Sequence, residues 1–219
     1  MPSPVLKTGL KVVGGLVVVA LSFVATLEFF DRTAVTTPPD HQVIANAPPE
    51  RRLEGRGTTL AAVWPVVTRG KISVENGLLA FVEDTADGEH FLATPELMKG
   101  DRIEVQVSAT IDAGAVEPTE GVMLYLISGD GTAFVQFDLA QVKSLKPQEL
   151  GARVLDGSIR RLANGRLELL ARFEVVGDKK RFHIRLQTTR NGVGSYKGTG
   201  RTGWKVDSTV VRMFDTGRS

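Results

Sequence analysis

The chain has 219 residues, of which 42% are hydrophobic, and it carries a formal net charge of +2 and no cysteine. This length and apolar content suffice for one ordinary domain with its own core, so a wholly disordered chain is excluded. Without cysteine there is no disulfide, thiolate metal site or cysteine nucleophile, and the small net charge does not indicate nucleic acid as a partner.

The N-terminal segment, residues 1–30, is predicted to anchor the chain in a lipid bilayer. Its run from Val12 to Leu27 contains no charge. As a helix this run spans about 24 Å, short of the roughly 30 Å of a bilayer core, and Phe29 and Phe30 lengthen it. The residues chosen to mark the anchor are Val12, Leu16, Val19, Phe23, Leu27 and Phe30.

The flanks of this segment predict its orientation. Lys7 and Lys11 precede the apolar run, so the positive-inside rule keeps the N-terminus in the cytoplasm. In a bacterium this predicts an inner-membrane protein whose β-domain lies in the periplasm. A cleavable signal peptide is the alternative, because such peptides also combine a positive start with a short apolar core. Cleavage after Ala25 would place Phe23 at position −3, where a small residue is preferred.

Residues 31–63 are expected to form an extended linker or a strap over another surface. Two proline pairs, Pro38-Pro39 and Pro48-Pro49, interrupt this segment. Each pair disfavours helix before it and favours a polyproline-like course.

Residues 64–219 are expected to be mainly β and to form an antiparallel β-sandwich. Apolar and polar residues alternate in runs that are typical of half-buried strands, namely residues 101–111, 121–128, 132–139, 166–175, 181–188 and 204–214. Turn sequences separate several of them, such as Gly129-Asp130-Gly131 and Asn164-Gly165. Residues 151–219 hold 15 Lys and Arg against 6 Asp and Glu. We expect the sandwich to blend this excess with the acidic strands that precede it, although such asymmetry also marks surfaces that meet an acidic partner.

The stretches "ENGLLAFVED", "RRLANGRLELLARFEV" and "RFHIRLQTTRNGVGSYKGTGRTGWKVDSTVVRMF" resemble the jelly-roll modules of bacterial carbohydrate-binding domains. The resemblance covers residues 64–214. It implies a jelly-roll sandwich, a sugar ligand and, in many such modules, a structural calcium ion. One position departs from the pattern, because Arg166 stands where the family usually has an aromatic residue.

Gly198, Gly200 and Gly203 spell G-x-G-x-x-G, the fingerprint of dinucleotide sites. That fingerprint needs a helix after it, because the helix N-terminus holds the phosphates. The residues that follow alternate as a strand, so we interpret the glycines as serving backbone conformation.

Other chemistry is sparsely indicated. The loop "VEDTADGEH" offers carboxylates that suit calcium, and Asp84, Asp87 and Asp207 are the candidates to watch. No pattern indicates a catalytic residue or a site for haem, chlorophyll or an iron–sulfur cluster, so we expect neither an enzyme nor a cofactor. Tyr196 and Trp204 flank the glycine loop and are the candidate platform for a sugar, unless they are simply buried.

Two functions remain. We expect a noncatalytic accessory subunit whose sandwich docks on other subunits of a membrane complex, for which a respiratory or photosynthetic complex is one natural host. The alternative is a membrane-tethered module that binds glycans at the cell envelope.

Overall fold

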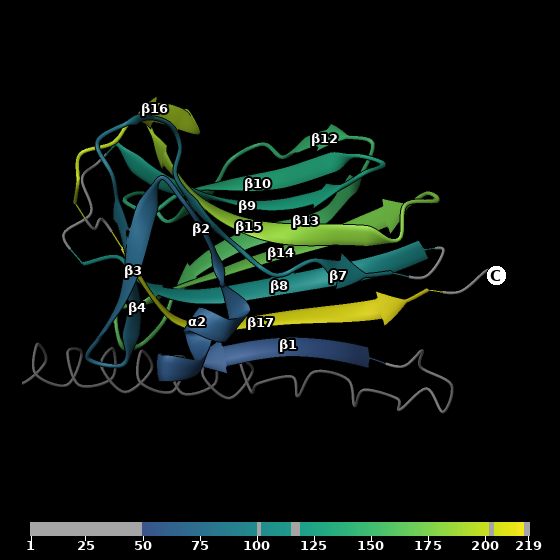
Figure 1. Cartoon of the computed structure of the whole chain (residues 1–219), viewed down its shortest axis with the longest axis horizontal. Helices are drawn as coiled ribbons and strands as arrows, with labels where there is room; N and C mark the ends of the chain where they lie inside the picture. The colour runs from purple at the N-terminus through teal and green to yellow at the C-terminus, as the bar shows by residue number, and fades with distance from the viewer. Residues whose placement is uncertain (1–49, 100–101, 115–118, 202–203, 217–219) are drawn as a thin grey trace, which may run out of the picture. The chain divides into compact units, whose positions relative to one another are not determined.

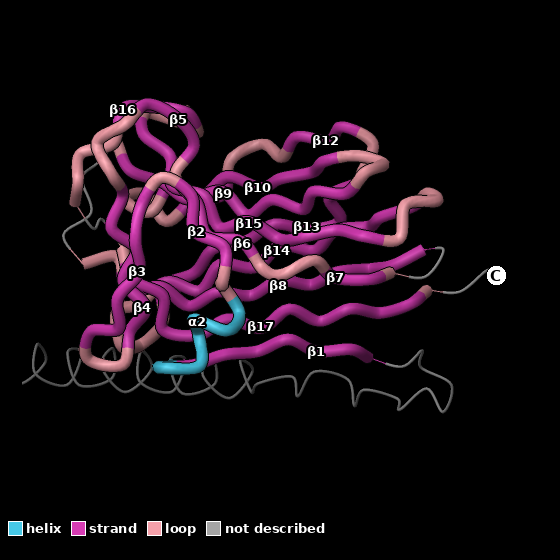
Figure 2. The backbone as a smooth tube through the Cα atoms, viewed as in Figure 1, coloured by secondary structure: helices cyan, strands magenta, loops and turns pink. Residues whose placement is uncertain are grey.

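The computed structural model describes residues 50–99, 102–114, 119–201 and 204–216. They form two packed antiparallel sheets with only two short helical turns (Figures 1 and 2), which confirms the mainly β sandwich. The predicted membrane anchor and residues 31–49 of the predicted linker lie outside the described residues. In the part of the chain that is described, no helix is long and apolar enough to cross a membrane.

The first sheet has seven strands among the described residues, in the order β13-β14-β8-β17-β4-β3, with β1 also paired to β17. Their bounds are β1 Glu50–Arg56, β3 Gly70–Glu75, β4 Leu78–Glu83, β8 Arg102–Asp112, β13 Arg153–Arg161, β14 Leu167–Val176 and β17 Lys205–Asp215.

The second sheet has eight strands within the same ranges, in the order β11-β10-β9-β15-β6-β2, with β12 beside β10 and β7 beside β15. The bounds are β2 Val66–Thr68, β6 Phe91–Ala93, β7 Leu97–Met98, β9 Glu120–Ser128, β10 Thr132–Asp138, β11 Lys143–Ser144, β12 Gln148–Leu150 and β15 Arg181–Arg190. A small separate sheet pairs β5 (Asp87–Glu89) with β16 (Ser195–Lys197).

The core lies between the two sheets and follows the period-two alternation of the sequence. In β8 the residues of one parity are fully buried, whereas those of the other parity are exposed or partly exposed. The buried residues are Ile103, Val105, Val107, Ala109 and Ile111. Because alternate side chains point to opposite faces of a sheet, each long strand of this kind contributes one apolar face to the core.

The sandwich begins earlier than the predicted boundary at Trp64, because residues 50–63 belong to it. β1 pairs with β17 along its whole length. After it come a 3-10 turn, η1 (Gly57–Thr59), and the short helix α2 (Leu60–Val63), whose Leu60 and Val63 are buried in the core. The sequence "ERRLEGR" has a single apolar residue, so its hydrophobic pattern alone does not reveal a strand.

Strands from the acidic and basic parts of the chain lie side by side on the outer face of the first sheet. Arg172 of β14 pairs with Glu104 of β8 at 2.5 Å, and Arg102 of β8 pairs with Glu174 of β14. The blending of charge expected from the sequence is therefore present on this face.

Candidate functional site

The outer face of the second sheet carries a pair of aromatic rings. Tyr125 of β9 and Phe134 of β10 are direct cross-strand partners, and both are partly exposed. Their ring centroids lie 4.6 Å apart with an interplanar angle of 38°. Their neighbours of opposite parity, such as Leu124 and Val135, point into the core. The two rings therefore form a continuous aromatic surface on the side of the sheet away from the core.

A cation lies next to this aromatic pair. Arg185 of β15 is the cross-strand partner of Tyr125 on its other side. Its guanidinium lies 4.2 Å from the ring centroid of Phe91 and donates a hydrogen bond to Glu89 at 3.3 Å. These contacts hold the guanidinium against the face of the sheet. They leave a polar group beside the exposed rings.

The protonation of this face is set by burial and by Arg185. Burial raises the pKa of Tyr125, the nearby Glu89 raises it further, and Arg185 opposes them. The phenol therefore keeps its proton at neutral pH and can donate a hydrogen bond. Burial lowers the pKa of His183, and Arg185 lowers it further. This agrees with the hydrogen bond that Arg185 Nε donates to His183 Nε2 at 3.2 Å, because an accepting nitrogen must be unprotonated.

A surface hollow of about 500 Å³ lies beside these residues. Ile127 and His183, which pair across β9 and β15, lie on the same face as Tyr125 and Arg185 and line it. The remaining lining residues are Glu96, Ser128, Gly129, Lys179, Lys180, Arg181 and Phe182. The volume is within the usual range for small-molecule sites. Flat rings, hydrogen-bonding groups and an adjoining hollow together suit a ring-shaped polar ligand.

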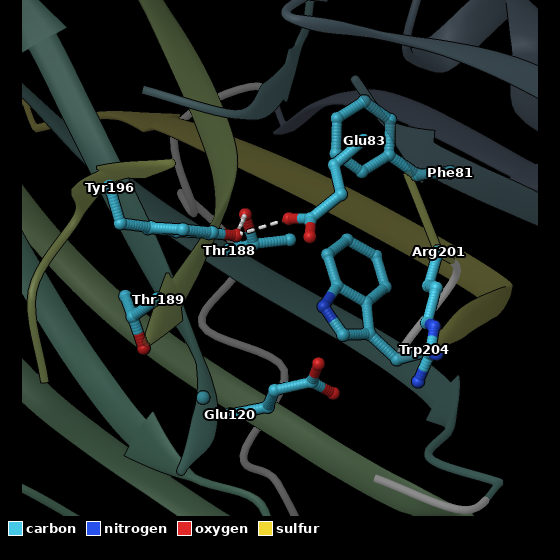
Figure 3. Close-up of a pocket in the computed structure, with 9 residues that line it drawn as sticks. Phe81, Glu83, Glu120, Thr188, Thr189, Tyr196, Arg201 and Trp204 are labelled. Carbon is cyan, nitrogen blue, oxygen red and sulfur yellow. Dashed lines mark hydrogen bonds between the residues drawn. The ribbon is translucent and has the colours of Figure 1, made fainter. Parts of the chain in front are cut away.

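Tyr196 and Trp204, the platform expected from the sequence, are brought together, but in a different setting. Both line a partly enclosed cavity of about 10 Å³, which has room for a single water molecule (Figure 3). Trp204 is only 3% exposed, and its ring centroid lies 6.2 Å from that of Phe81. The rings of Tyr196 and His90 lie 4.8 Å apart. Trp204 thus has no face open to a ligand. Tyr196 is partly exposed, so the two rings form no shared platform.

The buried carboxylate of Glu83 organises that enclosed cluster. It accepts hydrogen bonds from the Tyr196 hydroxyl at 2.5 Å and from the backbone N–H and hydroxyl of Thr199 at 2.7 and 2.6 Å (Figure 3 draws the Tyr196 bond). A guanidinium nitrogen of Arg190 lies 3.6 Å from Glu83 and 3.1 Å from Glu120. These contacts tie the loop after β16 to the end of β4.

The same contacts set the protonation of Glu83 and Tyr196. Burial pushes the pKa of Glu83 upward, but the hydrogen bonds from Thr199 and Tyr196 outweigh it and leave the pKa below its ordinary value. Burial and the bond to Glu83 raise the pKa of Tyr196 strongly. At neutral pH the pair is a carboxylate held by a neutral phenol.

The three calcium candidates are dispersed among other partners. Asp84 lies 3.3 Å from His90 and accepts a hydrogen bond from the backbone N–H of Ala86. Asp87 lies in the small sheet, and Asp207 of β17 pairs with Arg166 at 2.7 Å. Across the ranges that the structure covers, no three His, Cys, Asp or Glu side chains gather as a metal site. Arg166, the departure from the family pattern, thus serves as the ion-pair partner of Asp207.

The glycine loop has the structural role expected of it. Gly200 has a φ of +74°, a conformation that favours glycine. A Cβ on Gly198 would lie 2.0 Å from the backbone oxygen of Asp84, so only glycine fits there. The strand β17 follows from Lys205. Gly203 lies outside the described residues.

Among the solved structures, the comparisons found carbohydrate-binding modules at low similarity. The structure is similar to a CBM35 module from Cellvibrio japonicus Abf62, with 11% identity, a TM-score of 0.40, and coverage of 77% of this chain and 100% of that one. It is also similar to the C-terminal CBM6 of LamC, a laminarinase from Zobellia galactanivorans, with 8% identity, a TM-score of 0.34, and 75% and 100% coverage. TmCBM27, a module described as recognising mannan, is similar with 13% identity, a TM-score of 0.34, and coverage of 74% of this chain and 98% of that one. No protein-family model and no curated protein matches the sequence.

Proposed function

We propose that the sandwich is a noncatalytic glycan-binding module whose ligand lies on the outer face of the second sheet. The observation that carries the proposal is the partly exposed Tyr125–Phe134 ring pair beside Arg185 and the hollow. Aromatic faces accept the C–H face of a sugar ring, and flanking polar groups hydrogen-bond its hydroxyls. The Tyr125 hydroxyl and the Gln136 side chain, on the same face as Phe134, are such groups.

The lining of the hollow favours an acidic glycan. Lys179, Lys180 and Arg181 line it together with one carboxylate, Glu96, which pairs with Arg181 at 2.9 Å. A ligand carboxylate in this hollow would meet more positive than negative charge. Uronate-containing oligosaccharides are therefore expected to bind more tightly than neutral ones of equal length, and the preference should weaken as salt is raised.

The test is an array of neutral and uronate-containing glycans probed with the full-length chain in detergent. Tyr125→Ala and Phe134→Ala should each weaken binding about tenfold or more, which is the effect of losing about 1.4 kcal/mol. The matched control is Phe214→Ala, because Phe214 is a partly exposed aromatic residue on the first sheet. The proposal is overturned if no glycan binds, or if binding survives both changes in the ring pair.

Membrane attachment remains a proposal from the N-terminal sequence. We propose that residues 1–30 hold the module at the inner membrane with its sandwich in the periplasm, where envelope glycans are accessible. Protease added to intact spheroplasts should digest the sandwich and leave the N-terminus protected. A mature form that begins after Ala25 would contradict this attachment.

The role of accessory subunit rests on the same apolar run, from Val12 to Leu27. If it holds, gentle detergent extraction should recover the chain in a large complex of defined composition. Recovery as a free monomer would count against the accessory role, and it would leave the glycan proposal standing.

A further inference from the structure

We propose that β1 is a self-complementary edge strand through which two copies of this chain pair antiparallel, joining their first sheets. β1 lies at the border of the first sheet, beside β17 (Figure 1). Within the described residues, no strand pairs with its other edge. An open edge of this kind presents backbone donors and acceptors that a further strand can use.

The backbone shows which residues of β1 point toward this open edge. The N–H of Arg56 donates to Thr59 Oγ1 at 2.9 Å, and the Thr59 hydroxyl donates back to the carbonyl of Arg56 at 2.9 Å. The backbone N–H and C=O groups of Arg56 therefore point away from β17. In an antiparallel strand this direction alternates, and the pairing of β1 with β17 runs without a register shift. Glu54, Arg52 and Glu50 must then also point their N–H and C=O groups outward.

The side chains of these same residues alternate in charge. Glu50, Arg52, Glu54 and Arg56 are all exposed and lie on one face of the strand. Only pairings that place outward-pointing residues opposite one another can form backbone hydrogen bonds. The allowed registers therefore differ from one another by shifts of two residues. Charge pairing then decides which of these registers is favoured.

A two-fold axis at Leu53 gives the favourable register. Arg52 then lies opposite Glu54 of the second copy on both sides of the axis. Opposite charges therefore meet at the two pairs that can form backbone hydrogen bonds, because the backbone groups of Arg56 are already bonded to Thr59. Centring on Arg52 sets Arg52 against itself and Glu50 against Glu54. Centring on Glu54 sets Glu54 against itself and Arg52 against Arg56. Charge thus selects one long register, and a second copy of this chain is the partner that it fits.

β1 is also firmly held in its own sandwich, which favours edge pairing over exchange of the strand. Arg51 donates to the backbone carbonyl of Met98 at 2.7 Å and pairs with Asp215 at 3.3 Å. Gly55 lies directly against α2, since a Cβ there would lie 2.7 Å from a methyl group of Val63. A second copy can therefore add to the edge without displacing the strand.

The natural chain has no cysteine, so single-cysteine variants of the full-length chain in detergent give a clean readout. In the proposed register the two Leu53 Cα atoms lie about 4.5 Å apart as a non-hydrogen-bonded pair, within the range for a disulfide. Leu53→Cys should form a linked dimer under mild oxidation. The control is Val74→Cys, at an exposed position on β3, which should not.

Leu53 also packs against the core, so a second pair of variants guards against misfolding. A mixture of Arg52→Cys and a tagged Glu54→Cys, both at exposed positions, should give the mixed disulfide in preference to either homodimer.

Charge reversal separates edge pairing from association through any other part of the chain. Adding Glu54→Arg to Leu53→Cys should lower the linked fraction about tenfold, because Arg52 then meets an arginine on both sides of the axis. The double exchange Arg52→Glu/Glu54→Arg should restore it. The proposal is overturned if Leu53→Cys forms no more linked dimer than Val74→Cys. That result is expected if residues 31–49 of the same chain cover the edge of β1. The proposal is also overturned if Glu54→Arg leaves the disulfide-linked fraction of Leu53→Cys unchanged.

Discussion

The molecule contains two aromatic clusters that differ in what surrounds them. Tyr196 and Trp204 line a cavity with room for one water molecule, and the Tyr196 hydroxyl donates a hydrogen bond to Glu83. Tyr125 and Phe134 stack on the outer face of the second sheet, beside a hollow of about 500 Å³. Aromatic residues therefore stabilise the fold in the first cluster and form a partly exposed surface in the second. Side-chain parity within the strand and the loops that cover each face decide between the two roles.

The largest effect is expected from breaking the enclosed cluster at its carboxylate. Glu83→Ala would leave Arg190, Tyr196 and Thr199 without their shared acceptor. Arg190 keeps its pairing with Glu120, but the loss of a buried charged acceptor of three hydrogen bonds costs about 3–5 kcal/mol, so the free energy of unfolding in urea should fall by that amount. Glu168→Ala is the control, since Glu168 pairs with the exposed Arg160, and its cost should be below about 1 kcal/mol. Equal costs for the two would show that the cluster is not buried as described.

Trp204 distinguishes a core role from a ligand role. Trp204→Ala should cost about 3–5 kcal/mol in unfolding free energy, because it leaves a cavity beside Phe81. Trp204→Phe should keep most of the packing and leave glycan affinity unchanged. A selective loss of glycan binding in Trp204→Phe, with stability retained, would reverse the assignment of the two clusters.

The enclosed cluster should also give the stability of the protein a dependence on pH. The pKa of Glu83 lies below its ordinary value of 4.5 in the folded state, so folding favours the carboxylate. Its contribution is then fully present above about pH 4.5 and is lost as the pH falls through the lower, folded-state pKa. Urea unfolding at a series of pH values should show this loss in the natural chain and a smaller one in Glu83→Gln. The same dependence of unfolding free energy on pH in the natural chain and in Glu83→Gln would contradict this role of Glu83.

The smallest effect is expected from removing one hydroxyl from the exposed pair. Tyr125→Phe should change the unfolding free energy by less than about 0.5 kcal/mol, because the position is on the surface. It should weaken glycan binding less than Tyr125→Ala does, since the ring remains. Calorimetric titration with the best glycan from the array measures both variants. If Tyr125→Phe and Tyr125→Ala were equally impaired, the hydroxyl would carry the interaction instead of the ring.

The sequence predicted the long strands closely, because each is marked by local alternation. The run at 101–111 became β8, and the run at 166–175 became β14. It missed β13, where charged residues interrupt the apolar pattern of "RVLDGSIRR", and β1 for a similar reason. β1 is held by pairing with β17, which is far away in the sequence, whereas β13 is held by its hairpin with β14.

The site was harder to predict than the strands. The sequence did not single out Tyr125 and Phe134, because both lie in apolar strand runs. In "GVMLYLIS" both parities are apolar, and Met123 is buried although it shares the parity of Tyr125, so this pattern does not reveal that Tyr125 is partly exposed. Tyr196 and Trp204 attracted attention because they flank a glycine loop, but proximity in sequence says little about exposure.

The sequence by itself determined the mainly β class, the positions of the turns and the glycines that the loop before β17 requires, because these depend on the conformational preferences of neighbouring residues. Only the tertiary structure decided which aromatic rings are covered, which charges are paired and which strand is left at an edge. Those outcomes depend on segments that are distant in the chain and adjacent in space. Burial and electrostatics act between whatever groups the fold brings together, and a linear pattern does not contain that information.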